Sequence, residues 1–460
     1  MAHEGSPLWA KDLPLDEALH RFTVGEDPVT DLALLPWDIV GSAAHARTLA
    51  EGGFLTVPDA ASLLEALKVL HGEALAGRIR ITPAMEDGHT ALELALVERC
   101  GEAGKRIHLG RSRNDQVILA LRLLYRDELA QLGEQVALIA AAFLALAERH
   151  PRTPMPGYTH LRRAMPSSWG LWGAAFAEGL LEELEALGGL LHRLDRCPSG
   201  AAAGFGAPLP LDRARTAALL GFSRVQGNPI DVMNSRGRHE GAIADWLASV
   251  ASVLEKAFWD LAIFSMEEVG FVALPDAFTT GSSIMPQKRN PDAVELARAT
   301  CRHLRGQAGL VHELSGGLPS SYHRDLQLLK APVLDMLRRA SKLFAVLPSL
   351  IEGLIIDPLR CEGACGGELH AAHAATALAI GGMPFREAYR EVAHRILEGT
   401  FMPDQSAGCG AHPADTATPG ARLREQRNSL QALREGWGAA LDQLWETPST
   451  GPSSRHQENP

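Results

Sequence analysis

The residue types best suited to chemistry in this chain lie together in residues 281–292, which read GSSIMPQKRNPD. Ser282 follows a glycine, so its backbone has room to move, and Lys288 comes six residues later. Asn290 precedes a proline, a pair that favours the N-cap and first position of a helix. A helix start offers free N–H groups and a positive dipole end to an anion. A mobile serine, a cation and an anion cradle so close together predict chemistry on a dicarboxylate.

A Gly-Ser-Ser run followed by a proline is, taken alone, most often a flexible loop. The longer pattern G-S-S-x-M-P-x-K-x-N-P is more specific. It resembles the signature of the fumarase/aspartase superfamily, whose members eliminate fumarate from substituted succinates. The resemblance covers most of residues 35–400. It implies an all-α, three-domain fold with a central bundle of five long helices, which forms a multi-helix core in a homotetramer.

A second polar run, HLGRSRNDQ, spans residues 108–116. Arg113 can pair in a bidentate manner with a carboxylate, and Asn114 can both donate and accept hydrogen bonds. Without further context, this is an ordinary charged helix start. The run resembles the G-R-S-R-N-D-Q segment of the argininosuccinate lyase branch, which implies that both residues bind substrate. It also implies the reversible β-elimination of argininosuccinate to L-arginine and fumarate, a step of arginine biosynthesis.

A histidine lies between two stretches of long helix, in the run PGYTHL at residues 156–161. A loop histidine can deliver a proton near neutral pH, although a lone one is more often incidental. The surrounding run resembles P-G-Y-T-H-L-x-R-A-x-P of the same family. The resemblance implies that Thr159 binds substrate and that His160 takes part in proton transfer.

Two further segments match the family. The run EDGH, which contains Asp87 and His89, resembles the family's E-D-x-H segment. It implies that Asp87 positions the leaving amine and that His89 holds local structure. A later segment matches through Tyr322, Gln327 and Lys330, which the resemblance assigns to the amino-acid half of the substrate. Without the resemblance, this later segment would be an ordinary helix entry.

The resemblance also implies a division of chemical roles. Ser282 is expected to be the base, activated by nearby positive charge and by exclusion of water after the loop closes about Gly281. Lys288 and Asn290 are expected to stabilise the enediolate-like carbanion. His160 is expected to help protonate the departing guanidinium nitrogen. No metal and no organic cofactor is needed.

Long helices are expected to position these residues. From Asp115 to about His150 the chain has no proline, and apolar residues recur every three or four positions, which indicates one amphipathic helix. Such lengths exceed the ~11–12-residue average and favour an elongated bundle, with no large sheet. The further helices are predicted over residues 166–196, 237–269, 291–314 and 325–351. The predicted domains are 1–112 (mixed helical), 113–362 (central bundle) and 363–460 (small helical domain with a polar tail).

Asn114 and His160 flank the first long helix, so its length constrains where they can act. Roughly 35 residues at ~1.5 Å per residue separate them by ~50 Å. They cannot share an active site within one subunit. If both act on one substrate, different subunits must supply them. The resemblance to the superfamily implies that this oligomer is a homotetramer with active sites shared between subunits.

One position departs from the family pattern in a way that bears on specificity. Aligned on the run DIVGS at residues 38–42, Asp27 falls where the family has a substrate-binding serine. A carboxylate there would repel the succinate half of a substrate but could attract an ammonium group. A sister lyase that releases fumarate from another N-succinyl amine or from aspartate is therefore the alternative. A catalytically silent structural tetramer is less favoured, because Ser282, His160 and Lys288 are all present.

Composition bounds the remaining partners. The formal net charge of −11, from 55 acidic and 44 basic side chains, argues against a nucleic-acid partner. Six cysteines show no spacing of a secreted disulfide framework, and a metal site at Cys361 and Cys365 is less favoured than buried helix thiols. No apolar signal core and no membrane-crossing stretch is expected. We therefore expect a reduced, cytoplasmic protein whose partner is a small-molecule substrate.

Overall fold

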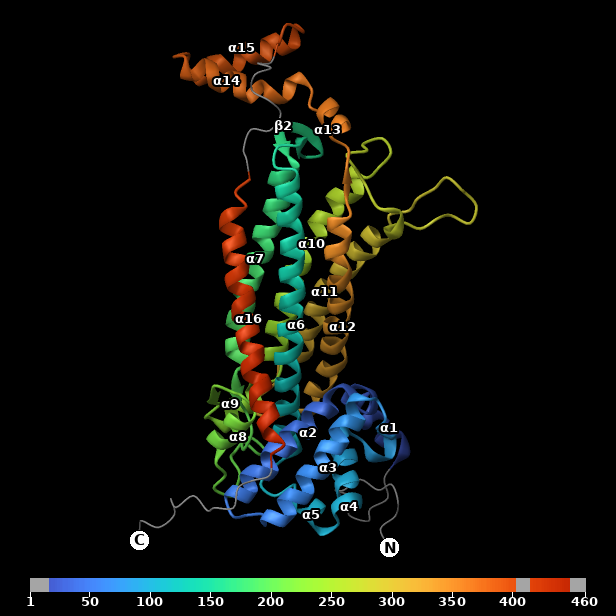
Figure 1. Ribbon diagram of the computed structural model, residues 1–460, viewed down its shortest axis with the longest axis vertical. Coiled ribbons are helices and arrows are strands. Elements are labelled where there is room, and N and C mark those ends of the chain that lie inside the picture. Colours follow the sequence, from blue (N-terminus) through green and yellow to red (C-terminus); the bar gives the residue numbers. More distant parts are fainter. Residues whose placement is uncertain (1–15, 403–413, 447–460) are drawn as a thin grey trace.

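The computed structural model describes residues 16–402 and 414–446 and shows an elongated bundle of helices (Figure 1). The prediction of a mostly helical fold is confirmed, and the five predicted long helices are present. The predicted second helix begins only at Trp169, because residues 162–168 form a strand. The five predicted helices are α6 (Arg113–Arg149), α7 (Trp169–Leu194), α10 (Arg238–Phe264), α11 (Asp292–Ser315) and α12 (Lys330–Glu352). Two further helices of comparable length, α2 (Asp27–Glu51, 25 residues) and α16 (Ala417–Leu444, 28 residues), were not predicted.

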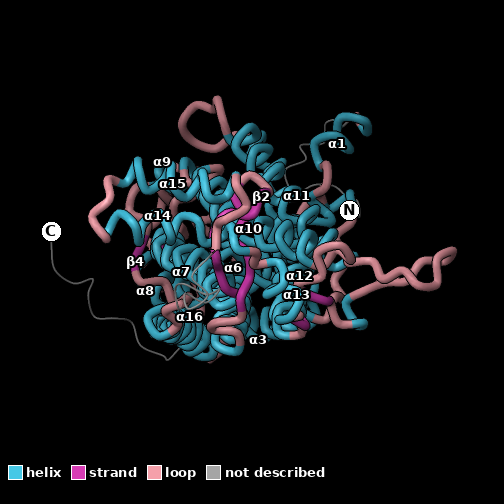
Figure 2. Tube along the Cα trace, turned by 90° about the horizontal axis from the view of Figure 1, so that it is seen from above, coloured by secondary structure: helices cyan, strands magenta, loops and turns pink. Residues whose placement is uncertain are grey.

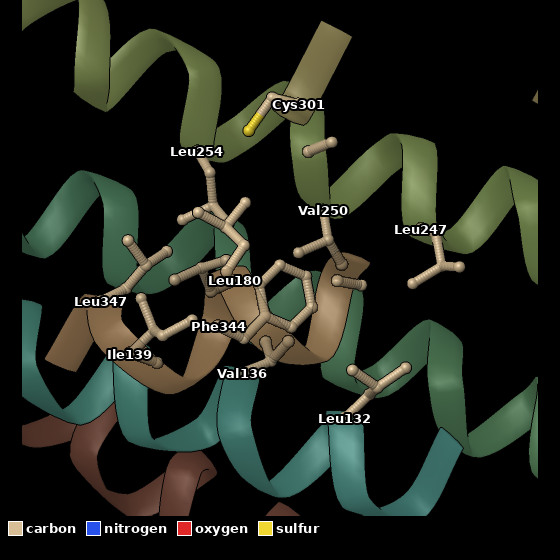
Figure 3. Packing of buried hydrophobic residues seen from close by; sticks show 14 of the residues in the cluster. Leu132, Val136, Ile139, Leu180, Leu247, Val250, Leu254, Cys301, Phe344 and Leu347 are labelled. Atoms are coloured by element: carbon tan, nitrogen blue, oxygen red, sulfur yellow. The ribbon is translucent and has the colours of Figure 1, made fainter. Parts of the chain in front are cut away.

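The apolar faces of these helices meet in the core of the bundle. Figure 3 shows Val136 and Ile139 of α6 packed with Phe344 of α12. Leu180 of α7 and Val250 of α10 belong to the same cluster, and each of these five side chains is 0 % exposed. Burying a side chain of this size contributes about 1.5–3 kcal/mol. This core fixes the distance between groups at the two ends of the bundle.

Helix α6 has a well-defined start. Ser112 Oγ accepts a hydrogen bond from the backbone N–H of Asn114, and Asp115 Oδ1 accepts one from the N–H of Ser112, which completes a capping box. The prediction that no stretch could cross a membrane is wrong by length and composition, since an 18-residue window of α6 has a mean hydropathy of 1.7. Of that window, 67 % is buried inside the bundle, so core packing accounts for its apolar character.

Further helices surround the end of the bundle at which α6 begins, at the bottom of Figure 1. The longest of them, α2, packs against α3, α4 and α6. The helices at this end are α1 (Glu17–Val24), α2 (Asp27–Glu51), α3 (Val57–Leu75), α4 (Gly88–Cys100), α5 (Glu102–Arg106), α8 (Arg213–Leu219) and α9 (Pro229–Asn234).

The opposite end of the bundle carries a β-hairpin of β1 (Pro154–Thr159) and β2 (Arg162–Ser168). His160 and Leu161 connect the strands with φ values of 52° and 57°, as the twist of a two-residue hairpin loop requires. The expected loop between the two long helices is therefore a pair of strands, with His160 in the connection between them. The other two sheets are also two-stranded: β3 (Arg196–Cys197) with β4 (Arg224–Val225), and β5 (Val272–Ala273) with β6 (Ile355–Ile356).

The last helices divide between two places. The helices α13 (Pro358–Ala364), α14 (Ala371–Ile380) and α15 (Phe385–Leu397) lie beyond the hairpin end, at the top of Figure 1. In contrast, α16 (Ala417–Leu444) runs back along α6 and α7. The division of the chain into three domains stays a prediction.

The cysteines depart from the prediction of a reduced protein at one position. Cys100, Cys197, Cys301 and Cys361 are free thiols, whereas Cys365 is disulfide-bonded. Within residues 16–402 and 414–446, no group of three or more His, Cys, Asp and Glu side chains is arranged to hold a metal ion.

Candidate active site

A cavity of about 210 Å³ lies where α2, α4 and the start of α6 meet the start of α12. Its walls bring together residues from distant parts of the chain. Among them are six of the residues predicted to bind substrate: Asp87, Arg113, Asn114, Tyr322, Gln327 and Lys330.

The Arg113 guanidinium is held by the protein itself. Its Nη1 lies 3.2 Å from Oδ2 of Asp87, and its Nη2 donates to Oγ1 of Thr90. Asp87 also caps α4 by accepting from the N–H of Thr90 at 2.8 Å. Burial alone would raise the pKa of Asp87, but His89, Arg113 and Thr90 together lower it. Arg113 and Asp87 thus form a fixed, charged corner of the cavity.

Lys330 forms a second charged corner with two aspartates of α2. Its Nζ lies 2.6 Å from Oδ1 of Asp27 and 2.6 Å from Oδ1 of Asp31. Asp31 also accepts a hydrogen bond from the backbone N–H of Gly88, which joins α2 to the start of α4. Burial raises the pKa of Asp27, with Lys330 opposing this shift and Asp31 adding to it.

Gln327, Tyr322 and Asn114 are the remaining predicted residues of the cavity. The Gln327 side chain donates to the carbonyl oxygens of Thr23 and Val24 at the end of α1, at 3.1 and 3.0 Å. Gln327 lies in η3 (Arg324–Leu329), the short turn that leads into α12. Tyr322 precedes this turn, and Asn114 lies in the first turn of α6. Three separate elements therefore position these side chains on one cavity.

A buried ion pair supports the cavity from below. Nδ1 of His89 lies 2.7 Å from Oδ2 of Asp38, whose other oxygen accepts from the Gln116 side chain at 3.1 Å. Burial alone would lower the pKa of His89, but Asp38 and the neighbouring carboxylates raise it to about 9. His89 is thus an imidazolium at neutral pH, and it ties α4 to α2.

Sequence reasoning missed several residues of this cavity. Asp31 could have been found, because it lies four residues after Asp27 and so on the same face of a helix. Arg324 also lines the cavity, and its Nη2 donates to the carbonyl of Thr23. Arg236 is a further lining residue, paired with Glu240 at 2.8 Å; no local pattern indicated this role.

The predicted residues Thr159 and His160 lie far from this cavity. Both are exposed, at the tip of the β1–β2 hairpin. Helix α6 has 37 residues, which at ~1.5 Å per residue separates the hairpin from the cavity by ~55 Å. Within one chain, these two residues and the cavity do not form one site.

The loop over residues 279–291 holds Ser282, Lys288 and Asn290, and it extends sideways from the bundle (Figures 1 and 2). Ser282 Oγ accepts hydrogen bonds from the backbone N–H groups of Ile284 and Met285, at 3.3 and 3.1 Å. Lys288 is exposed. This loop is also separate from the cavity, in the half of the bundle nearer the hairpin (Figure 1).

The prediction that Asn290 caps α11 is wrong. Its backbone N–H and carbonyl pair with Thr280 at 2.8 and 3.1 Å in an isolated β-bridge, which closes the base of the loop. The N-cap is instead Pro291, and α11 begins at Asp292. Asp292 and Glu295 occupy the first turn, so this helix start carries negative side chains of its own.

The chain is similar to known proteins over most of its length. A family described as Lyase matches residues 16–306. An argininosuccinate lyase of Sorangium cellulosum is 48 % identical over 389 residues, which cover 85 % of this chain and 90 % of the relative. An argininosuccinate lyase of Thermotoga neapolitana is 38 % identical over 388 residues, or 84 % of this chain and 98 % of the relative.

Solved structures show the same fold at lower identity. EDDS lyase in complex with formate matches with a TM-score of 0.77 and 24 % identity, over 94 % of this chain and 95 % of that one. A fumarate lyase:delta crystallin from Brucella melitensis bound to cobalt matches with a TM-score of 0.70 and 19 % identity, over 93 % and 97 %. The sequence relatives share a higher identity with this chain than these structures do. By the identity and coverage of those relatives, the chain belongs to the argininosuccinate lyase family.

Proposed function

We propose that the protein catalyses the reversible elimination of argininosuccinate to L-arginine and fumarate, and that it does so in the cytoplasm. Sequence relatives 38–48 % identical over most of the chain support this function. The observation that carries it in the structure is the single cavity lined by Asp87, Arg113, Asn114, Tyr322 and Lys330. This cavity combines carboxylates with cations, as a substrate that carries both kinds of charge requires.

The reaction needs a base, a stabiliser of negative charge and an acid. Ser282 would remove the proton from the carbon next to a carboxylate of the succinyl half, and the electron pair of that bond would become the double bond of fumarate. Lys288 and Asn290 would stabilise the negative charge that builds up on the carboxylate. The bond from carbon to the guanidino nitrogen would break, with His160 helping to protonate that nitrogen.

These roles require residues that one chain keeps apart. The cavity and His160 are separated by the length of α6, ~55 Å, while Ser282 lies on a projecting loop. We infer that the active form is a homotetramer in which a hairpin and a loop from neighbouring subunits complete each cavity. The exposed positions of Thr159, His160 and Lys288 support this inference, since they leave these side chains available to another subunit.

The first test is fumarate release from argininosuccinate, followed by ultraviolet absorbance, with aspartate, malate and adenylosuccinate as parallel substrates. Fumarate from argininosuccinate alone is the expected result. Release from a different substrate would support the same elimination reaction but would identify the protein as a sister lyase with another specificity. No release from any of them, by a folded tetramer, would favour a structural role.

A second test addresses the shared site. Asn114→Leu and His160→Gln are each expected to be inactive, and their co-expression should restore roughly one quarter of the sites if subunits assort randomly in a symmetric oligomer. The matched control is co-expression of His160→Gln with His160→Ala, which leaves every hairpin defective and should restore nothing. Failure of the first pair to recover activity would rule out sites shared between subunits.

A further inference from the structure

Two carboxylates of α2 share the ammonium group of Lys330. The distances from Nζ to Oδ1 of Asp27 and to Oδ1 of Asp31 are both 2.6 Å. The three side chains are largely buried, with 6 % of Lys330, 16 % of Asp27 and 5 % of Asp31 exposed. With both aspartates ionised, this group carries one net negative charge on the wall of the cavity.

The two carboxylates differ in their remaining hydrogen-bond partners. Oδ2 of Asp31 accepts a hydrogen bond from the backbone N–H of Gly88 at 3.0 Å. Oδ2 of Asp27 accepts none from any residue in the described part of the chain, although Asp27 lines the cavity. Asp27 therefore has an oxygen that no described residue engages, whereas both oxygens of Asp31 already have a partner.

The other cations of the cavity do not neutralise Asp27. Arg113 pairs with Asp87, and Arg236 pairs with Glu240. Arg324 also lines the cavity, but its guanidinium donates to the Gln327 side chain and to the carbonyl of Thr23 rather than to Asp27. A bound ligand that brings a positive charge to Asp27 would compensate the excess negative charge there.

Lys330 provides a positive charge next to Asp27 on the same wall of the cavity. An ammonium group has three N–H donors, and two of them face Asp27 and Asp31. The third remains for a ligand carboxylate, next to Gln327 and Tyr322 on the cavity wall. An α-amino acid carries an ammonium and a carboxylate on one carbon, so its two charges match the adjacent Asp27 and Lys330.

We propose that Asp27 is a specificity-determining residue that binds the α-ammonium group of the amino-acid half of the substrate, while Lys330 binds its α-carboxylate. This inference rests on the proposed function, because it concerns the amine that is released together with fumarate. Substrates that lack a free α-ammonium group are then discriminated against even when their succinyl half is unchanged. A serine, which the resemblance to the family places at this position, cannot provide the same charge.

The test is the binding of two ligands by isothermal titration calorimetry. One is L-arginine, and the other is 5-guanidinopentanoate, which is arginine with the α-ammonium group replaced by hydrogen. Wild-type protein should bind arginine more tightly. Asp27→Asn should weaken arginine binding by about 10–100-fold, the range for a hydrogen bond between charged groups, and leave 5-guanidinopentanoate within about twofold.

Two further variants guard against indirect effects. Glu26→Gln removes the adjacent, exposed carboxylate and should bind both ligands as the wild type does. Asp27→Ser is a smaller replacement, for use if Asp27→Asn does not fold, and it should show the same selective loss of arginine. The melting temperature of each variant monitors folding.

Kinetics separate this inference from the proposed function. In the fumarate assay, Asp27→Asn should raise KM for argininosuccinate by about 10–100-fold and leave kcat within about threefold. Equal weakening of both ligands by Asp27→Asn would overturn the proposal, because Asp27 would then act only by positioning Lys330. Selective arginine binding by a wild-type protein that releases no fumarate from argininosuccinate would support the ammonium site and overturn the proposed function instead.

Discussion

The cavity beside α2 and the loop over residues 279–291 both carry predicted site residues, yet they are built in opposite ways. In the cavity, Lys330 is 6 % exposed and lies between two carboxylates, and Arg113 pairs with Asp87. In the loop, Lys288 is exposed and forms no ion pair with any residue the structure describes. Ser282 accepts hydrogen bonds only from backbone N–H groups of its own loop.

The difference shows which part of the proposed site is already ordered in the folded chain. The cavity residues are fixed by contacts that also hold the helices together, so the proposed binding half is formed within a single chain. The loop residues contribute few such contacts, so under the proposed function their geometry is free to change when substrate and neighbouring subunits bind. Recognition and chemistry are thus expected to respond differently to the same kind of mutation.

The largest expected effect is kinetic and lies in the loop. Ser282→Ala should lower kcat by about 10²–10⁴-fold, the range for loss of a general base. The melting temperature should stay within about 2–4 °C, since only two backbone hydrogen bonds of an exposed loop are lost. Fumarate release and thermal unfolding check the two halves of this prediction. Substantial residual activity would remove Ser282 from the role of base.

A pair of lysine variants tests the contrast directly. Lys330→Met should lower the free energy of unfolding by about 3–5 kcal/mol, because it leaves Asp27 and Asp31 buried without their cation. Lys288→Met should change it by less than about 0.5 kcal/mol, as expected for an exposed side chain without partners, while still abolishing turnover. Urea unfolding measures both values. Equal, small effects would show that the cavity is no more preorganised than the loop.

The smallest expected effect is a pH dependence of stability that comes from the buried ion pair between His89 and Asp38. His89 has a pKa of about 9 in the folded protein against an ordinary value of 6.5, so its pairing with Asp38 stabilises the fold fully below pH 6.5. This stabilisation should be lost as the pH rises through 9, and the difference between the two values corresponds to about 3 kcal/mol. Unfolding curves between pH 6 and 10 measure it.

His89→Gln is the control for this titration. The variant has no imidazole to lose a proton, so its stability should vary less over the same pH interval. A wild-type profile that matches the variant's would show that the His89–Asp38 pair does not contribute as described.

Much of the fold could be predicted from the sequence because helix periodicity is a local signal. The five long helices follow from apolar residues three and four positions apart, as in the run that contains Val136 and Ile139. The hairpin was missed because its short strands contain Pro154, Pro156 and Pro166, which suppress a strand pattern. The cap at Asn290 was wrong because Thr280, ten residues earlier, pairs with its backbone.

The candidate site was less accessible to local reasoning. Six predicted residues line one cavity, but the resemblance to a family indicated them, since their spacing in the chain reveals no common location. Their chemical roles stay predictions, as do those of Ser282 and His160. The partners of Lys330 depend on α2 and α12 meeting in space, and the pairing of Asp27 with it could not be derived from either segment alone.

The apolar helix α6 has a consequence for how the chain is made. Its residues end at Arg149, whereas α16, which covers it on one side, ends at Leu444. At ~5–20 residues per second of synthesis, the 295 residues between these positions (444 − 149) take ~15–60 s to emerge. During that interval α7 and α12 can already cover part of a helix apolar enough to cross a bilayer, but the side that α16 covers stays without its partner.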